Sequence, residues 1–138
     1  MGCRLNPSVN ENTEPQPPIA NPLGWPSVLR WVLFIACVSG VLYAIFRPTP
    51  PEMLFDNSDK VGHFLAFSGL SLTAFIALKG RFAWAMWASL VLLAFVLEYL
   101  QGVFLPLRTF SLEDSYANLV GVAIGFVVCQ FIGRFRSR

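Results

Sequence analysis

The chain has 138 residues, of which 55% are hydrophobic and only 13% charged, with a net charge of +2 at pH 7. Soluble domains carry about 25% charged residues, and a chain of this length could not hide so many apolar side chains without exposing large apolar patches to water. The composition therefore excludes an entirely disordered chain, a nucleic-acid-binding module and a disulfide-stapled secreted domain. It predicts an integral membrane protein whose first partners are membrane lipids.

The chain begins with a segment unlike the rest. Residues 1–26 hold six of the ten prolines together with several Asn, Glu and Gln residues. Such a segment cannot bury enough apolar surface to offset the entropy lost on ordering. We predict a disordered tail over residues 1–26.

Four apolar blocks follow, over residues 28–46, 61–78, 82–105 and 115–133. Each approaches the ~20 residues that a helix needs to cross a bilayer. In hydrocarbon the backbone must satisfy its hydrogen bonds within the segment, so the blocks are predicted to be helices. The fold class is therefore all-α, an integral membrane four-helix bundle over residues 28–133, followed by a basic tail at 134–138.

Positive charges predict the orientation of the bundle. With the N-terminus inside, the inner side carries seven Lys and Arg residues and the outer side three. Cytoplasmic loops carry the excess of positive charge in membrane proteins. We expect both termini on the cytoplasmic side of a bacterial inner membrane, with 134–138 as a cytoplasmic anchor.

Polar residues interrupt the apolar blocks at specific positions. Glu98 lies within the third block, and Gln101 follows on the same helical face. An ionisable residue inside a span is a candidate functional residue, because placing one at the bilayer centre costs about 2.5–3.5 kcal/mol. Asp59 and His63 are spaced i, i+4 at the outer end of the second helix, so the carboxylate could orient the imidazole.

The same end of the bundle receives polar groups from the fourth helix and the loop before it. Asp114 and Asn118 repeat the i, i+4 spacing, and Arg108 lies in the third-to-fourth loop. The predicted topology brings all these groups to one depth. The candidate binding residues at this outer end are Asp59, Lys60, His63, Glu98, Gln101, Arg108, Asp114 and Asn118.

Structural roles explain some of these residues equally well. Glu98 could pair with Arg108 or His63 simply to hold helices together. The run from Ser111 to Asp114 resembles a capping box, and Asp59 suits the positive end of a helix dipole.

Small residues on the fourth helix predict a packing face. Gly121 and Gly125, with Ala117 one turn earlier, follow the small-xxx-small spacing that allows close helix approach. Packing within the chain is the preferred interpretation, and homodimerisation is the second.

Three ordered motifs resemble those of the VanZ-like membrane proteins. The stretch Asp59–Phe67 is similar to that family's D-K-x-x-H-F-x-x-[FY] signature. Glu98 and Gln101 match its E-x-x-Q element. The stretch Arg108–Gly121 resembles R-x-x-[SD]-x-x-D-x-x-A-N-x-x-G, with Ser111 at a position that is often acidic. The resemblance implies a four-helix protein of the cell envelope, and a link to low-level resistance to the glycopeptide teicoplanin.

We prefer the hypothesis of an outward-facing polar pocket that binds or handles an envelope lipid or lipid-linked cell-wall precursor. Arg108 would hold an anionic head group, for which its planar fork is suited. Glu98 and Asn118 would supply acceptor and donor contacts, and lipid tails would lie between helices.

Two other hypotheses stay open. In the first, the chain is a membrane-embedded enzyme with Glu98 as general acid or base and His63 as its partner. His63, Glu98 and Asp114 could alternatively hold a divalent metal, but a single histidine argues against a typical zinc site, so no metal or cofactor is expected. In the second, the chain is a non-catalytic assembly subunit that docks a membrane protein partner or a second copy.

Overall fold

The computed structural model describes residues 24–48, 55–79, 82–106 and 109–136. Within these ranges it contains four helices and no strand: α1 (Ser27–Phe46), α2 (Ser58–Leu78), α3 (Ala83–Phe104) and α4 (Leu112–Arg136). All four are long and apolar enough to cross a membrane. The predicted all-α membrane fold is thus confirmed, and the chain is a multi-pass membrane protein. Residues 1–23 of the predicted N-terminal tail lie outside the described residues.

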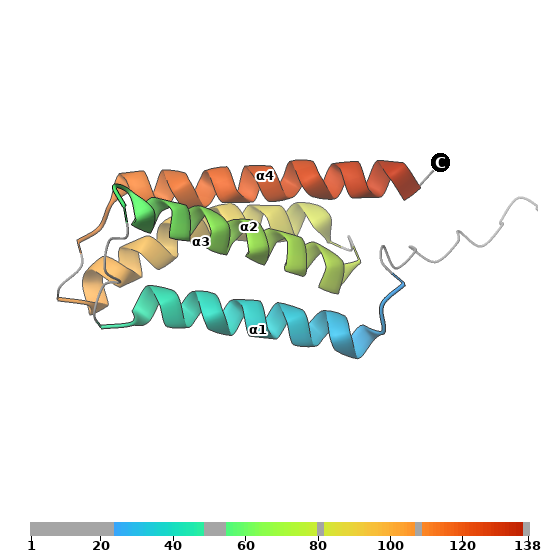
Figure 1. Cartoon of the computed structure of the whole chain (residues 1–138), viewed down its shortest axis with the longest axis horizontal. Helices are drawn as coiled ribbons and strands as arrows, with labels where there is room; N and C mark the ends of the chain where they lie inside the picture. Colours follow the sequence, from blue (N-terminus) through green and yellow to red (C-terminus); the bar gives the residue numbers. More distant parts are fainter. Residues whose placement is uncertain (1–23, 49–54, 80–81, 107–108, 137–138) are drawn as a thin grey trace, which may run out of the picture.

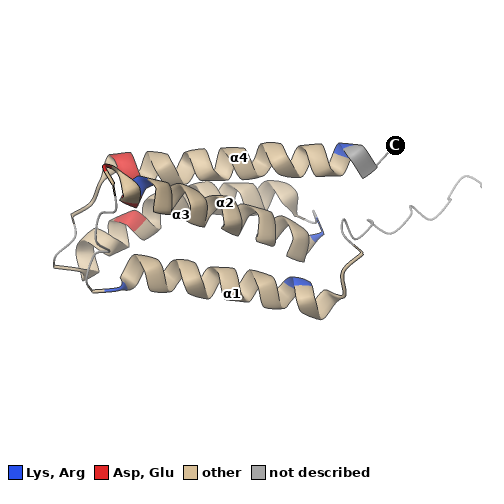
Figure 2. Cartoon of the chain, in the orientation of Figure 1, with Lys and Arg blue, Asp and Glu red and all other residues tan. Residues whose placement is uncertain are grey.

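The helices run alternately up and down along the long axis of the molecule (Figure 1). α1 and α3 therefore end, and α2 and α4 begin, at one end of the bundle. We call this the polar end, because the acidic residues of the helices gather there (Figure 2). α2 and α4 share the most extensive contact, whereas α1 packs against α2 and α3.

Two helices begin earlier than the apolar pattern predicts. α2 was expected from residue 61 and begins at Ser58, and α4 was expected from residue 115 and begins at Leu112. The added turns carry Asp59 and Glu113. Negative side chains stabilise a helix N-terminus because they oppose the partial positive charge of its free N–H groups. Hydropathy alone misses such turns, since they are polar.

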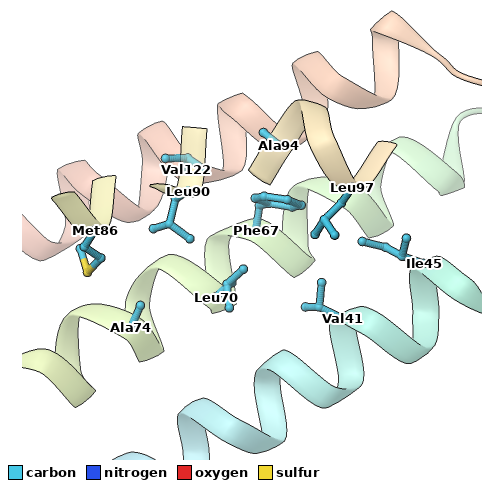
Figure 3. Packing of buried hydrophobic residues seen from close by; sticks show 10 residues of the cluster. All are labelled: Val41, Ile45, Phe67, Leu70, Ala74, Met86, Leu90, Ala94, Leu97 and Val122. Carbon is cyan, nitrogen blue, oxygen red and sulfur yellow. The ribbon is translucent and has the colours of Figure 1, made fainter. Parts of the chain in front are cut away.

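A narrow apolar core runs through the bundle. Phe67 and Ala94 are fully buried, and Val41, Leu90 and Leu97 lie around them (Figure 3). Most other apolar side chains within the spans point outward, for example those of Leu65, 60% exposed, and Leu92, 64% exposed. Such an outward-facing apolar surface is what a bilayer solvates and water does not.

Two glycines bring α4 against α2. A Cβ atom on Gly121 would lie 2.5 Å from the Phe64 carbonyl oxygen, and one on Gly125 would meet the Ser71 side chain. Ser68 Oγ also donates a hydrogen bond to the Gly121 carbonyl at 3.3 Å. Both glycines therefore make their close approach within one chain, while Ala117 is half-buried one turn earlier.

Candidate functional site

Four buried polar side chains from three helices meet at the polar end. His63 comes from the second turn of α2, Glu98 from α3, and Asp114 and Asn118 from the start of α4. Their exposed fractions are 9%, 2%, 8% and 0%, respectively. We call these four residues the polar cluster. They are far apart in sequence, so only the antiparallel arrangement of α2, α3 and α4 brings them together.

Asn118 sets the geometry of the imidazole. Its Nδ2 donates to the Ala94 carbonyl at 3.2 Å, which leaves Oδ1 as an acceptor facing His63 Nδ1 at 3.1 Å. In this network, His63 Nδ1 carries the hydrogen and donates a hydrogen bond to Asn118 Oδ1. Glu98 Oε2 lies 3.9 Å from the same nitrogen. The imidazole is therefore held between an amide and a carboxylate.

The other oxygen of Glu98 holds the loop before α4. Glu98 Oε1 accepts a hydrogen bond from the Ser111 backbone nitrogen at 3.3 Å. Ser111 in turn caps α4, because its Oγ accepts from the Asp114 backbone nitrogen at 3.2 Å. Half of the expected capping box is thus formed by Ser111 and Asp114. The carboxylate on the Ser111 nitrogen, however, belongs to α3 and not to Asp114.

Because Glu98 accepts from the Ser111 nitrogen in place of Asp114, the Asp114 carboxylate is left facing His63 and Glu98. Its Oδ1 is buried and has no hydrogen-bond partner among the described residues. One ligand atom each from His63, Glu98 and Asp114 lies within 4.8 Å of the other two. One nitrogen and two oxygens at this spacing form a donor set that a divalent cation can use.

Asp59 does not orient the imidazole as expected. No hydrogen bond or ion pair joins Asp59 to His63 among the described contacts, and Asp59 Oδ1 is buried without a hydrogen-bond partner there. His63 instead turns toward Asn118. A helical i, i+4 spacing places two residues on one face, but the ring nitrogen Nδ1 contacts Asn118 of α4.

Asp59 and Gln101 line a small cavity beside the cluster. Gln101 Nε2 donates to the Ile45 carbonyl at 3.0 Å, which ties α3 to the end of α1. The cavity measures about 130 Å³, and we call it the polar-end cavity. Its lining residues are Ala44, Ile45, Ser58, Asp59, Gly62, His63, Ala66 and Gln101.

An apolar cavity of about 360 Å³ follows along the same three helices. Val41, Leu70 and Leu97 line it, each one helical turn from a residue that lines the polar-end cavity: Ile45, Ala66 and Gln101. The two cavities therefore succeed one another between α1, α2 and α3.

Lys60 lies at the rim of the polar end. Its Nζ forms an ion pair with Glu113 Oε2 at 2.9 Å and donates to Asn57 Oδ1 at 2.7 Å. Because the Glu113 side chain is 74% exposed, this pair links the first turns of α2 and α4 at the surface. Arg108, the last of the candidate binding residues, lies outside the described residues.

Sequence reasoning missed the role of Arg30, which was counted only as a positive charge. Its side chain is buried at the opposite end of the bundle, where Nη1 donates to the carbonyls of Ile76 at 3.1 Å and Ala77 at 3.2 Å. These carbonyls lie in the last turn of α2 and have no partner within the helix. An arginine inside an apolar block was the available signal.

The protein-family comparison covers almost the whole helical region. The family model described as VanZ/LLP1 matches residues 29–133, which includes α2, α3, the polar cluster and all but the ends of α1 and α4. The chain belongs to the VanZ/LLP1 family. No curated protein and no solved structure matches the chain significantly. Every member of the polar cluster of this VanZ/LLP1 protein falls within the matched region.

Proposed function

We propose that this VanZ/LLP1 protein binds an envelope lipid or a lipid-linked cell-wall precursor. The observation that carries the proposal is a cavity lined in part by Asp59, His63 and Gln101, followed along α1, α2 and α3 by an apolar stretch of cavity. A lipid has the same succession of a polar head and an apolar tail. The larger cavity lies within the range of about 300–1,000 Å³ that is usual for ligand pockets.

The polar-end cavity offers contacts for a head group with hydroxyl or amine donors. Asp59 Oδ1 has no hydrogen-bond partner among the described residues, so it can accept from such a donor without losing another bond. Lys60 and Arg108 are the proposed contacts for phosphate, and Lys60 lies one residue from the lining of the cavity.

The apolar cavity offers a place for an acyl or prenyl tail. Leu42 lines this cavity and is 41% exposed, so the cavity wall reaches the lipid-facing surface of α1. A tail could therefore enter sideways from the bilayer while its head stays at the polar end. The exchange of bilayer lipid for bound lipid would then need no crossing of the membrane.

A plugged cavity tests this proposal. Leu42→Trp would fill the lipid-facing side of the apolar cavity, whereas Leu65→Trp adds the same bulk at a 60% exposed position outside both cavity linings. Lipids retained by the detergent-purified protein would be measured by native mass spectrometry with phosphatidylglycerol and a lipid-linked precursor offered separately. We expect Leu42→Trp alone to lose the retained lipid; equal retention in wild type and both variants would refute the proposal.

Cellular role follows from the same proposal. We place the protein in the bacterial inner membrane, with the polar end outward, where it meets envelope precursors. The VanZ resemblance adds the expectation that its expression lowers teicoplanin susceptibility. If so, Glu98→Gln and Arg108→Ala should abolish the change in susceptibility while leaving expression and melting normal; loss of accumulation in both variants would favour a purely structural cluster.

The proximity of His63 and Glu98 favours a second candidate, an acid/base enzyme acting on the same lipid. A buried carboxylate 3.9 Å from an imidazole can exchange a proton with a bound substrate. Purified protein would then convert a lipid-linked substrate, and Glu98→Ala or His63→Ala would abolish turnover. Absence of turnover with any envelope lipid would leave binding as the function.

A further inference from the structure

The polar cluster brings two buried carboxylates close to one imidazole. Glu98 and Asp114 are 2% and 8% exposed, and both sit within a membrane-spanning helix. Two carboxylates this close repel each other when both are charged, and the repulsion is stronger in a buried site than in water.

The Asp114 carboxylate is the least satisfied of these groups. The backbone nitrogen of Asp114 takes part in the helix cap, because it donates a hydrogen bond to Ser111 Oγ. Its Oδ1 nevertheless has no hydrogen-bond partner among the described residues, although the side chain is more than nine-tenths buried. A carboxylate oxygen in that state can accept a contact from a bound ligand without losing another bond.

We propose that His63, Glu98 and Asp114 hold a divalent cation of the Mn²⁺ kind. Their three ligand atoms lie within 4.8 Å of one another, and His63 Nδ1 lies 3.9 Å from Glu98 Oε2. Ligands about 2.1 Å from one ion are at most about 4.2 Å apart. A separation of 4.8 Å therefore needs to shorten by about 0.6 Å for ligands on opposite sides of the ion, and by more for adjacent ones, which side-chain rotation can supply.

The cation takes the place of the proton between His63 and Asn118. Metal binding requires a deprotonated nitrogen, so the proton moves from Nδ1 to Nε2 of the same ring. Asn118 Oδ1, 3.1 Å from Nδ1, then becomes the fourth ligand and the third oxygen. One imidazole with oxygen ligands suits Mn²⁺ better than the sulfur-rich or histidine-rich sets of structural zinc.

The cation site goes beyond the proposed lipid binding and exists without it. A role of the cation in binding a lipid head group does rest on the proposed function. In that role, open coordination positions of the cation would accept phosphate oxygens. For that reason the cation is measured in detergent with no phospholipid added. Mn²⁺ binding without lipid retention would remove only the proposed function, and lipid retention without Mn²⁺ binding would remove only the cation site.

A Mn²⁺ titration tests the site. Full-length protein, freed of any histidine tag and stripped with a chelator, would be titrated with Mn²⁺ while free Mn²⁺ is followed by electron paramagnetic resonance. We expect one Mn²⁺ per chain. Asp114→Asn, which keeps the helix cap through the backbone, should weaken binding about tenfold or more.

The matched control is the neighbouring carboxylate. Glu113→Gln removes a charge one residue away at a 74% exposed side chain, and it should leave Mn²⁺ affinity at the wild-type value. Equal weakening of Mn²⁺ binding by Asp114→Asn and Glu113→Gln would overturn the proposal, since it would indicate nonspecific electrostatic attraction of the cation to acidic side chains. An absence of Mn²⁺ binding by the wild-type protein would overturn it as well.

A spectroscopic signature keeps the test decisive if Asp114→Asn does not fold. His63 is the sole histidine of the chain, so a nitrogen coupling from a coordinated imidazole in pulsed paramagnetic resonance can come from no other residue. We expect this coupling in the wild-type Mn²⁺ complex. Bound Mn²⁺ without it would overturn the assignment.

Discussion

Glu98 on α3 accepts a hydrogen bond from the backbone nitrogen of Ser111, 13 residues further along the chain, at 3.3 Å. This bond ties the end of α3 to the residue that caps α4. The same side chain places its second oxygen 3.9 Å from His63 on α2. One buried carboxylate thus connects three helices, and its structural and chemical roles can be separated by substitution.

Glu98→Gln and Glu98→Ala should differ in stability. The amide oxygen of Gln can still accept from Ser111, whereas Ala leaves that nitrogen without its acceptor, at a cost of about 1–3 kcal/mol. Melting followed by circular dichroism in detergent would show a clearly lower transition for Ala than for Gln. Equal melting of the two variants would mean that the Ser111 bond contributes little.

The contact between α2 and α4 depends on two glycines. Gly121→Ala and Gly125→Ala should each lower the melting temperature strongly, because the new methyl group would collide with the Phe64 carbonyl or with Ser71. Gly40→Ala and Gly133→Ala are the controls, since nothing lies within 4 Å of a Cβ there. The controls should be neutral or stabilised by up to about 1 kcal/mol. A similar loss at all four positions would argue against the close approach.

Arg30 should stabilise the opposite end of the bundle. Arg30→Met keeps much of the apolar stem but removes the donors to Ile76 and Ala77, and Arg30→Lys keeps a charge without the planar fork. We expect stability to fall in the order Arg, Lys, Met, with a total loss of about 1–3 kcal/mol. Resistance to unfolding by sodium dodecyl sulfate would measure it, and a Met variant as stable as wild type would contradict it.

His63 and Asn118 should be energetically coupled. A double-mutant cycle with His63→Phe and Asn118→Leu should give a coupling energy of about 0.5–3 kcal/mol, as for residues that share a hydrogen bond. The reference cycle pairs His63→Phe with Gln101→Leu. Gln101 lines the same cavity but bonds to Ile45 instead, so its coupling should be near zero. A larger coupling energy in the reference cycle would show that His63 is coupled to its neighbours through the shared cavity and not through the hydrogen bond to Asn118.

The proposed orientation can be measured directly. Reporter domains fused after residue 138 should be active only as cytoplasmic reporters, and those inserted near residue 52 only as external ones. The reason is the excess of Lys and Arg on the side that holds both termini. The opposite pattern would place the polar end in the cytoplasm and remove the link to external precursors.

Several features could be predicted before any tertiary structure. The four spans follow from apolar length, because a helix must satisfy its own backbone in hydrocarbon. Burial of Glu98 and Gln101 follows from the cost of exposing them to lipid, and both are 2% exposed. The VanZ resemblance was carried by motif residues and is confirmed by the family match over residues 29–133.

Other features depended on contacts between helices. The sequence offered Asp59 as the partner of His63 because of their spacing along one helix, yet Asn118 of α4 takes that place. It offered Asp114 as the acidic member of a capping box, yet Glu98 holds the Ser111 nitrogen. In both cases a residue from another helix displaced the local partner, and only packing could decide which one lay closer.

Hydropathy and helical periodicity thus determined that this protein crosses the membrane four times, and that Glu98 and Gln101 turn inward. These properties depend on one segment and its solvent. The tertiary structure alone decided that Arg30 closes the end of α2, that Asp114 keeps a buried oxygen free of hydrogen bonds among the described residues, and how the cavities follow one another. Those properties depend on the register and the separation of neighbouring helices, which no single segment encodes.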